Sequence, residues 1–111
     1  MPLTAKMITM DCAEPRALAD WWATALETEV AGDHGDFVTV ATGSLTLAFQ
    51  RVPEKKQGKN RVHVDFCGDD RGQEVARLVR LGATAIGDHT MAGTSWTVLR
   101  DPDGNEFCVS D

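Results

Sequence analysis

Four side chains in the second half of this chain have the types and the spacing needed for chemistry. His63 and Asp65 occupy alternate positions in one segment of alternating polarity, and Glu106 and Cys108 do so in another. Alternate residues of a β-strand project from the same face, so each pair is expected to share a face. An imidazole beside a carboxylate can transfer protons near neutral pH, and both groups also bind divalent metals. These residues therefore predict a polar site carried by two strands.

The second of these segments follows a strong signal for chain reversal. Residues 101–104 read Asp-Pro-Asp-Gly. Pro102 fixes its own φ, the aspartates can bond to nearby backbone, and Gly104 accepts the positive φ of a tight turn. After the turn, Phe107 and Val109 alternate with the two polar residues. This pattern predicts a closing strand with one apolar face and one face available for function.

The elements that must position these residues occur in the same order twice. Each half predicts a strand, a helix and three further strands, which gives an α+β fold of two βαβββ modules at about residues 5–52 and 61–110. Pro15 indicates the start of the first helix, Asp69 or Asp70 the start of the second, and Gly82 its end. The strands are expected at 7–12, 28–30, 37–41 and 45–52, and then at 62–67, 84–86, 95–100 and 106–109.

In each half, the strand before the helix has one apolar face and one polar face. The apolar face is expected to pack on the apolar stripe of the helix that follows. The polar face, with Thr9 in the first half and His63 in the second, is expected to point away from the helices. We therefore expect burial of Ile8, Met10, Val62, Val64 and Phe66 against Leu18, Trp22, Val75 and Val79.

Composition and charge exclude several classes of partner. The chain has 111 residues, 42% of them hydrophobic, and a net charge of −6, which predicts one acidic domain over residues 1–111. The basic segment 51–61 is typical of a solvated loop or of anion steering, and no basic stripe suits nucleic acid or an anionic membrane. Cys12, Cys67 and Cys108 lack the spacing of a zinc knuckle, and no signal peptide or membrane span is apparent. These features predict reduced thiols in a cytoplasmic protein.

Three features together resemble the vicinal oxygen chelate superfamily, which includes glyoxalase I and the fosfomycin-resistance, bleomycin-resistance and extradiol dioxygenase proteins. They are the duplicated βαβββ order, His63 in the run RVHVDF, and DPDGNEF before the last strand. The runs LAFQRVPE, NRVHVDF and DPDGNEFCV are most similar to the small bacterial glyoxalase-like domains, over essentially the whole chain. The resemblance implies that the strands form a cupped, barrel-like mixed sheet with both helices on its convex side.

The resemblance also implies a divalent metal held by His, Glu or Gln side chains of the first, fourth, fifth and eighth strands. Only His63 stands at a matching position. The ligand position of the first strand falls at Met7 or Thr9. That of the fourth strand falls at Ala48, and Gln50 lies two residues later. That of the eighth strand falls at Cys108, and Glu106 lies two residues earlier. A chelate of His63, Glu106 and either Gln50 or Cys108 needs two shifts of ligand position along the strands, relative to the positions that the resemblance implies. We therefore expect less than one metal ion per chain.

The resemblance and the polar site together predict a protein that binds a small organic molecule. His63 and Glu106 are the catalytic candidates, for lyase- or isomerase-type chemistry. A non-catalytic binder of the bleomycin-resistance type is the alternative. The candidate ligand-binding residues are Thr9, Gln50, Asp65, Trp96 and Cys108.

Other roles for these residues stay open at this point. His63 could bond to Glu106 or Asp65 inside a cavity without taking part in a reaction, and the cysteines could fill apolar space. Trp96 could belong to the core or stack on a planar ligand. A homodimer is expected because a short duplicated chain leaves sheet edges open, and an interaction module that pairs through those edges is a further alternative.

Overall fold

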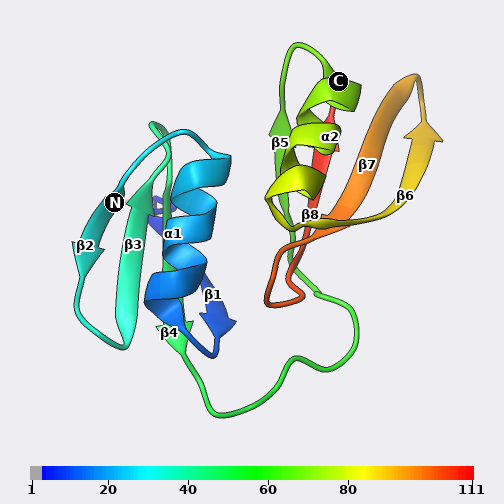
Figure 1. Cartoon of the computed structure of the whole chain (residues 1–111). Helices are drawn as coiled ribbons and strands as arrows, with labels where there is room; N and C mark the ends of the chain where they lie inside the picture. Colours follow the sequence, from blue (N-terminus) through cyan, green and yellow to red (C-terminus); the bar gives the residue numbers. More distant parts are fainter. Residues whose placement is uncertain (1–3) are drawn as a thin grey trace. The chain divides into compact units, whose positions relative to one another are not determined.

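The computed structural model describes residues 4–111 as two compact units, one running up to Lys55 and the other comprising Lys56–Asp111. Each unit contains a strand, a helix and three further strands (Figure 1). The first unit comprises β1 (Met7–Cys12), α1 (Pro15–Ala25), β2 (Val30–Asp33), β3 (Phe37–Ala41) and β4 (Thr46–Arg51). The second comprises β5 (Val64–Cys67), α2 (Arg71–Leu81), β6 (Thr84–Met91), β7 (Thr94–Arg100) and β8 (Glu106–Ser110). The prediction of two βαβββ modules is confirmed.

The two sheets have the same connectivity. Their strand orders are β1-β4-β3-β2 and β5-β8-β7-β6. The first strand of each unit pairs in parallel with the last, and all other neighbours are antiparallel. This pairing places the first and last strands of a unit side by side, although they are far apart in sequence. The cup implied by the resemblance concerns how the two sheets meet, and it stays a prediction.

Local sequence signals account for the start of α1 and for both ends of α2. Pro15 is the first residue of α1, where its missing N–H costs no hydrogen bond. Of the two aspartates considered for α2, Asp70 is the N-cap, and its Oδ1 accepts a hydrogen bond from the Gln73 N–H at 3.0 Å. Gly82 ends α2 with a φ of 118°, in the left-handed region that favours glycine. No helix within residues 4–111 has both the length and the apolar character needed to cross a bilayer.

Each helix packs on one face of its own sheet. In the first unit, Leu18 and Trp22 are buried together with Val38, Leu47 and Phe49. In the second unit, α2 contacts β6, β7 and β8, and the buried residues of this layer are Leu78, Leu99, Phe107 and Val109. The opposite face of the second sheet is therefore left for polar side chains.

The structure corrects two of the predicted burial positions. Val62 is 71% exposed, and β5 begins only at Val64. Val64 pairs with Phe107 in parallel, so a strand extended back to Val62 would meet Asn105 in the turn before β8 and would find no ladder partner. Val79 is 44% exposed, because the packed side of α2 is centred on Leu78.

Besides β5, two strands differ from the prediction by more than one residue at an end. The short strand expected at 28–30 begins at Val30 and runs to Asp33, since 26–28 continue from α1 with hydrogen bonds to its last turn. β6 runs to Met91 instead of ending at Ile86. Nearly all of its residues are exposed, so its sequence lacks the apolar alternation by which a strand is recognised.

Candidate functional site

A cavity of about 530 Å³ lies on the sheet face of the second unit that is turned away from α2. Alternate residues of β7 (Thr94, Trp96, Val98) and of β8 (Glu106, Cys108, Ser110) line it. The residues between them, Leu99, Phe107 and Val109 among others, are buried on the helix side. The register predicted from the alternation of the last strand is therefore correct.

Five of the seven predicted site residues line this one cavity: His63, Asp65, Trp96, Glu106 and Cys108. The other two, Thr9 and Gln50, lie in the first unit and are exposed. They occupy the neighbouring strands β1 and β4, in which Thr9 is paired with Ala48 and Asp11 with Gln50. A role for Thr9 and Gln50 in ligand binding stays a prediction.

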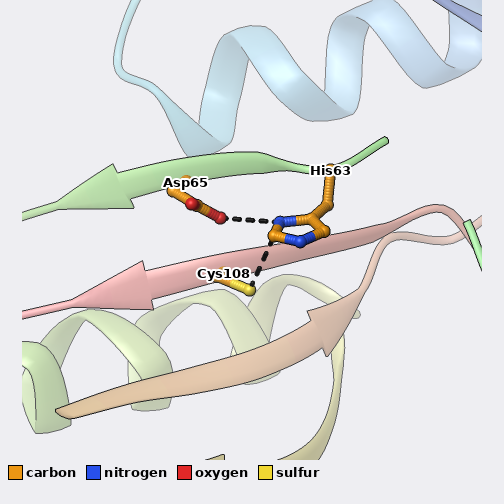
Figure 2. Close-up of side chains that lie close together, drawn as sticks. All are labelled: His63, Asp65 and Cys108. Atoms are coloured by element: carbon orange, nitrogen blue, oxygen red, sulfur yellow. Dashed lines mark hydrogen bonds and ion pairs between the residues drawn. The ribbon is translucent and has the colours of Figure 1, made fainter. Parts of the chain in front are cut away.

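His63, Asp65 and Cys108 form a compact polar cluster (Figure 2). Asp65 on β5 is paired directly with Cys108 on β8, and His63 precedes β5 on the same side. His63 Nδ1 lies 2.8 Å from Asp65 Oδ1 and 3.8 Å from Cys108 Sγ. Since the side chains of His63 and Asp65 are 43% and 63% exposed, their contact contributes little to stability. The fold therefore does not depend on this cluster for its stability.

The Cys108 thiol is held in its protonated form. Burial raises its pKa to about 11, and the charge and hydrogen bond of Asp65 act in the same direction. The thiolate is the nucleophilic form of cysteine, so Cys108 is not an activated nucleophile at neutral pH. Of the two roles considered for Cys108, this environment favours that of a buried side chain filling apolar space over that of a nucleophile.

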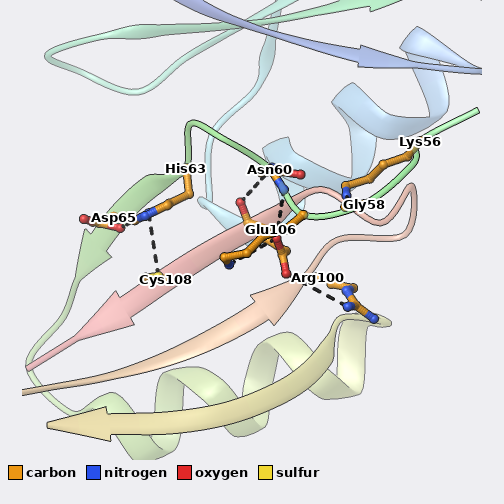
Figure 3. Close-up of polar contacts among 9 residues, drawn as sticks. Lys56, Gly58, Asn60, His63, Asp65, Arg100, Glu106 and Cys108 are labelled. Carbon is orange, nitrogen blue, oxygen red and sulfur yellow. Dashed lines mark hydrogen bonds and ion pairs between the residues drawn. The ribbon is translucent and has the colours of Figure 1, made fainter. Parts of the chain in front are cut away.

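Glu106 is a buried carboxylate that also lines the cavity, and Figure 3 shows its polar contacts. Its Oε2 accepts hydrogen bonds from the Asn60 backbone N–H at 3.0 Å and from Lys59 Nζ at 3.3 Å. Arg100 lies 4.0 Å from its Oε1. Burial by itself raises the pKa of Glu106, but the Asn60 hydrogen bond and the bond and charge of Lys59 outweigh it, so the pKa lies below its ordinary value. Glu106 is therefore ionised near neutral pH.

The contacts of His63 and Glu106 differ from the pair expected from the sequence. His63 bonds to Asp65, and Glu106 bonds to Lys59 and Asn60. The two residues share a cavity without bonding to each other. The alternative in which His63 bonds to Glu106 is not observed, whereas the alternative with Asp65 is.

His89 and Lys59 are among the residues that line the cavity but were not singled out by the sequence. His89 lies on β6, where a loop was expected, and its ring stacks on Trp96 with centroids 5.6 Å apart at 25°. Lys59 belongs to the basic segment before β5. His89 was missed because β6 lacks apolar alternation, and Lys59 because a contact between residues 47 positions apart leaves no local signal. Trp96 lines the cavity and is half-buried, with one face of its ring stacked against His89.

Comparisons with known proteins agree with this fold. Residues 7–110 match the family described as the glyoxalase-like domain, and the chain belongs to that family. No protein of curated function matches the sequence.

Solved structures with the same fold have low sequence identity to this chain. A glyoxalase/bleomycin resistance protein/dioxygenase family enzyme from Burkholderia phytofirmans is 15% identical with a TM-score of 0.82, and 95% of each chain is covered. A fosfomycin resistance protein from Mesorhizobium loti is 14% identical with a TM-score of 0.78, covering 99% of this chain and 92% of that one. A lactoylglutathione lyase from Agrobacterium tumefaciens is 18% identical with a TM-score of 0.73, covering 98% and 93%. At these identities the structures show the fold alone.

Proposed function

We propose that this chain binds a small organic molecule in the cavity of the second unit. The observation that carries the proposal is the volume of about 530 Å³, which is within the range of small-molecule sites. The wall combines the apolar surface of Trp96 and Val98 with polar groups from Lys59 and His63. Such a wall suits a planar ligand that stacks on Trp96 and carries a hydrogen-bonding or anionic group.

In this proposal His63 is the residue that moves a proton. Asp65 Oδ1 accepts the hydrogen bond of the Nδ1–H, which orients the imidazole and leaves Nε2 as the basic nitrogen. Glu106, the other catalytic candidate from the sequence, is not bonded to His63 and instead holds Lys59 at the cavity wall as an ionised carboxylate. Proton transfer by His63 would support lyase- or isomerase-type chemistry.

A second candidate function is binding without turnover, as in a sequestering protein of the bleomycin-resistance type. The observation that favours it is the set of contacts of Glu106, whose charge is already matched by Lys59 and the Asn60 N–H. A carboxylate in that state is a poor proton carrier at neutral pH. Turnover of a bound compound, measured beside its affinity, separates the two functions.

The ligand proposal is tested by a thermal-shift screen of small planar aromatic compounds, with and without a carboxylate, followed by calorimetry. We expect that Trp96→Ala weakens the binding of any compound found by about tenfold or more, because a stacking surface is lost. Val62→Ala is the matched control, since Val62 is in the same unit, 71% exposed and outside the cavity wall. Equal affinity in wild type and Trp96→Ala would place the ligand elsewhere.

We also propose that the chain forms a homodimer. β6 is an edge strand of eight residues, and Ile86 and Met91 on it are 44% and 70% exposed. Long exposed edges with apolar side chains pair readily with another chain. Light scattering at micromolar concentration is expected to give twice the 12.0 kDa of one chain. A species of 12.0 kDa would contradict the proposal.

A further inference from the structure

We propose that His63, Asp65 and Cys108 form a binding site for a thiophilic divalent cation, with Zn²⁺ as the best match. One ligand atom of each residue lies within 4.8 Å of the other two. All three residues belong to the second unit, and Asp65 and Cys108 are a direct pair in the β5–β8 ladder. The proposal does not depend on the small-molecule ligand.

The spacing of the donor atoms is close to that of a tetrahedral zinc site. With Zn–N and Zn–O of about 2.0–2.1 Å and Zn–S of about 2.3 Å, tetrahedral angles place N and S about 3.6 Å apart and N and O about 3.3 Å apart. The structure has 3.8 Å between His63 Nδ1 and Cys108 Sγ, and 2.8 Å between His63 Nδ1 and Asp65 Oδ1. Binding of an ion therefore requires the His63–Asp65 contact to open by about 0.5 Å and the His63–Cys108 contact to shorten by about 0.2 Å, while Asp65 and Cys108 already have donor atoms within 4.8 Å. Nδ1 then exchanges its bond to Asp65 for a bond to the ion.

The chemistry of the donors selects the ion. A thiolate and an imidazole favour Zn²⁺ and related ions, whereas Mg²⁺ and Ca²⁺ prefer sites made of oxygen atoms. On binding, the thiol proton of Cys108 passes to the solvent, and the thiolate and the Asp65 carboxylate together balance the two charges of the cation. Three protein ligands leave a fourth position open, as in catalytic zinc sites.

The site is accessible from the solvent side. The side chains of His63 and Asp65 are 43% and 63% exposed, while Cys108 is buried beneath them. An ion can therefore reach the three donors without opening of the fold. Within residues 4–111, this is the only group of three or more His, Cys, Asp or Glu side chains with donors close enough to hold an ion.

This donor set differs from the one implied by the family resemblance. The resemblance implied imidazole, carboxylate and amide ligands drawn from the strands of both halves. Here a thiol stands at the eighth-strand position, Asp65 adds a ligand two residues after His63, and Glu106 is engaged by Lys59 and Asn60. The expectation of less than one metal ion per chain counted only His63 as a ligand in place. That expectation did not include Asp65, which the β5–β8 pairing brings beside Cys108.

The test is a titration of metal-free protein with Co²⁺, which reports its ligands through visible absorption. We expect saturation at one equivalent and a sulfur-to-cobalt charge-transfer band in the near ultraviolet. Both this band and the visible absorption of the bound cobalt should disappear when Zn²⁺ displaces the cobalt. Mg²⁺ is expected not to compete. Cys108→Ser should abolish the charge-transfer band, and Cys67→Ser is the matched control that keeps it, because Cys67 is exposed and outside the cluster.

A second pair of variants keeps the test decisive if Cys108→Ser folds poorly. His63→Gln and Asp65→Asn change largely exposed side chains, so both should fold, and each should weaken Zn²⁺ binding by about tenfold or more. Zinc affinity is measured by competition with a coloured chelator. Absence of the charge-transfer band in the wild type, or its loss in Cys67→Ser, would overturn the proposal. Neither readout requires the small-molecule ligand, so the two proposals can fail separately.

Discussion

Replacing Phe107 with alanine is expected to destabilise the protein by about 3–5 kcal/mol. The Phe107 side chain, on the helix-facing side of β8, is 1% exposed and packs edge-to-face on Phe66, with ring centroids 6.0 Å apart. Its removal leaves a cavity between the sheet and α2 that the ladder of β7 and β8 prevents from closing. Urea denaturation monitored by tryptophan fluorescence measures the loss.

Val62→Ala is the control for this variant. Both residues are large and apolar and belong to the second unit, but Val62 is 71% exposed. Its truncation should change the free energy of unfolding by no more than about 0.5 kcal/mol. Similar losses in the two variants would contradict the strand register on which the cavity depends.

Replacing Glu106 with alanine is expected to cost about 1–3 kcal/mol at neutral pH. The substitution removes the acceptor of the Asn60 N–H and of Lys59 Nζ, so the segment before β5 loses its attachment to β8. Glu106→Gln should cost less, because an amide oxygen can still accept the Asn60 hydrogen bond. Chemical denaturation of the three proteins ranks them.

The loss caused by Glu106→Ala is expected to depend on pH. The pKa of Glu106 is lowered in the folded protein, so its ionised form stabilises the fold above the pKa of the unfolded chain. That contribution disappears as the pH falls through the folded pKa. The difference between wild type and Glu106→Ala should therefore shrink below about pH 4, and a constant difference down to pH 2 would contradict the assigned contacts.

Much of the fold was predictable because its signals are local. The Asp-Pro-Asp-Gly turn, the cap at Asp70 and the stop at Gly82 act within a few residues, and the structure confirms the strand after the turn and both ends of α2. The alternation of Glu106 and Cys108 with apolar residues placed both on the cavity side. Strand faces follow from a period of two, so one correct register positions every side chain on the strand.

The parts that escaped prediction depend on contacts between distant segments. The sequence does not indicate that Lys59 meets Glu106, or that Asp65 and Cys108 are paired across β5 and β8. Burial of Val62 was predicted from alternation alone, but β5 begins only at Val64, which pairs with Phe107 near the start of β8. β6 was shortened in the prediction because an edge strand exposed on both faces needs no apolar residues.

His63 Nδ1 contacts two side chains at once, and this shared position links proton transfer to metal binding. Asp65 Oδ1 and Cys108 Sγ both lie against this nitrogen, which can carry either a proton or an ion, but never both together. With the proton there, Nε2 is a base; with an ion there, Nε2 must carry the proton and cannot accept another. If His63 both transfers a proton and binds zinc, zinc would inhibit the proton transfer. Proton transfer by His63 would then decrease as the free zinc concentration rises.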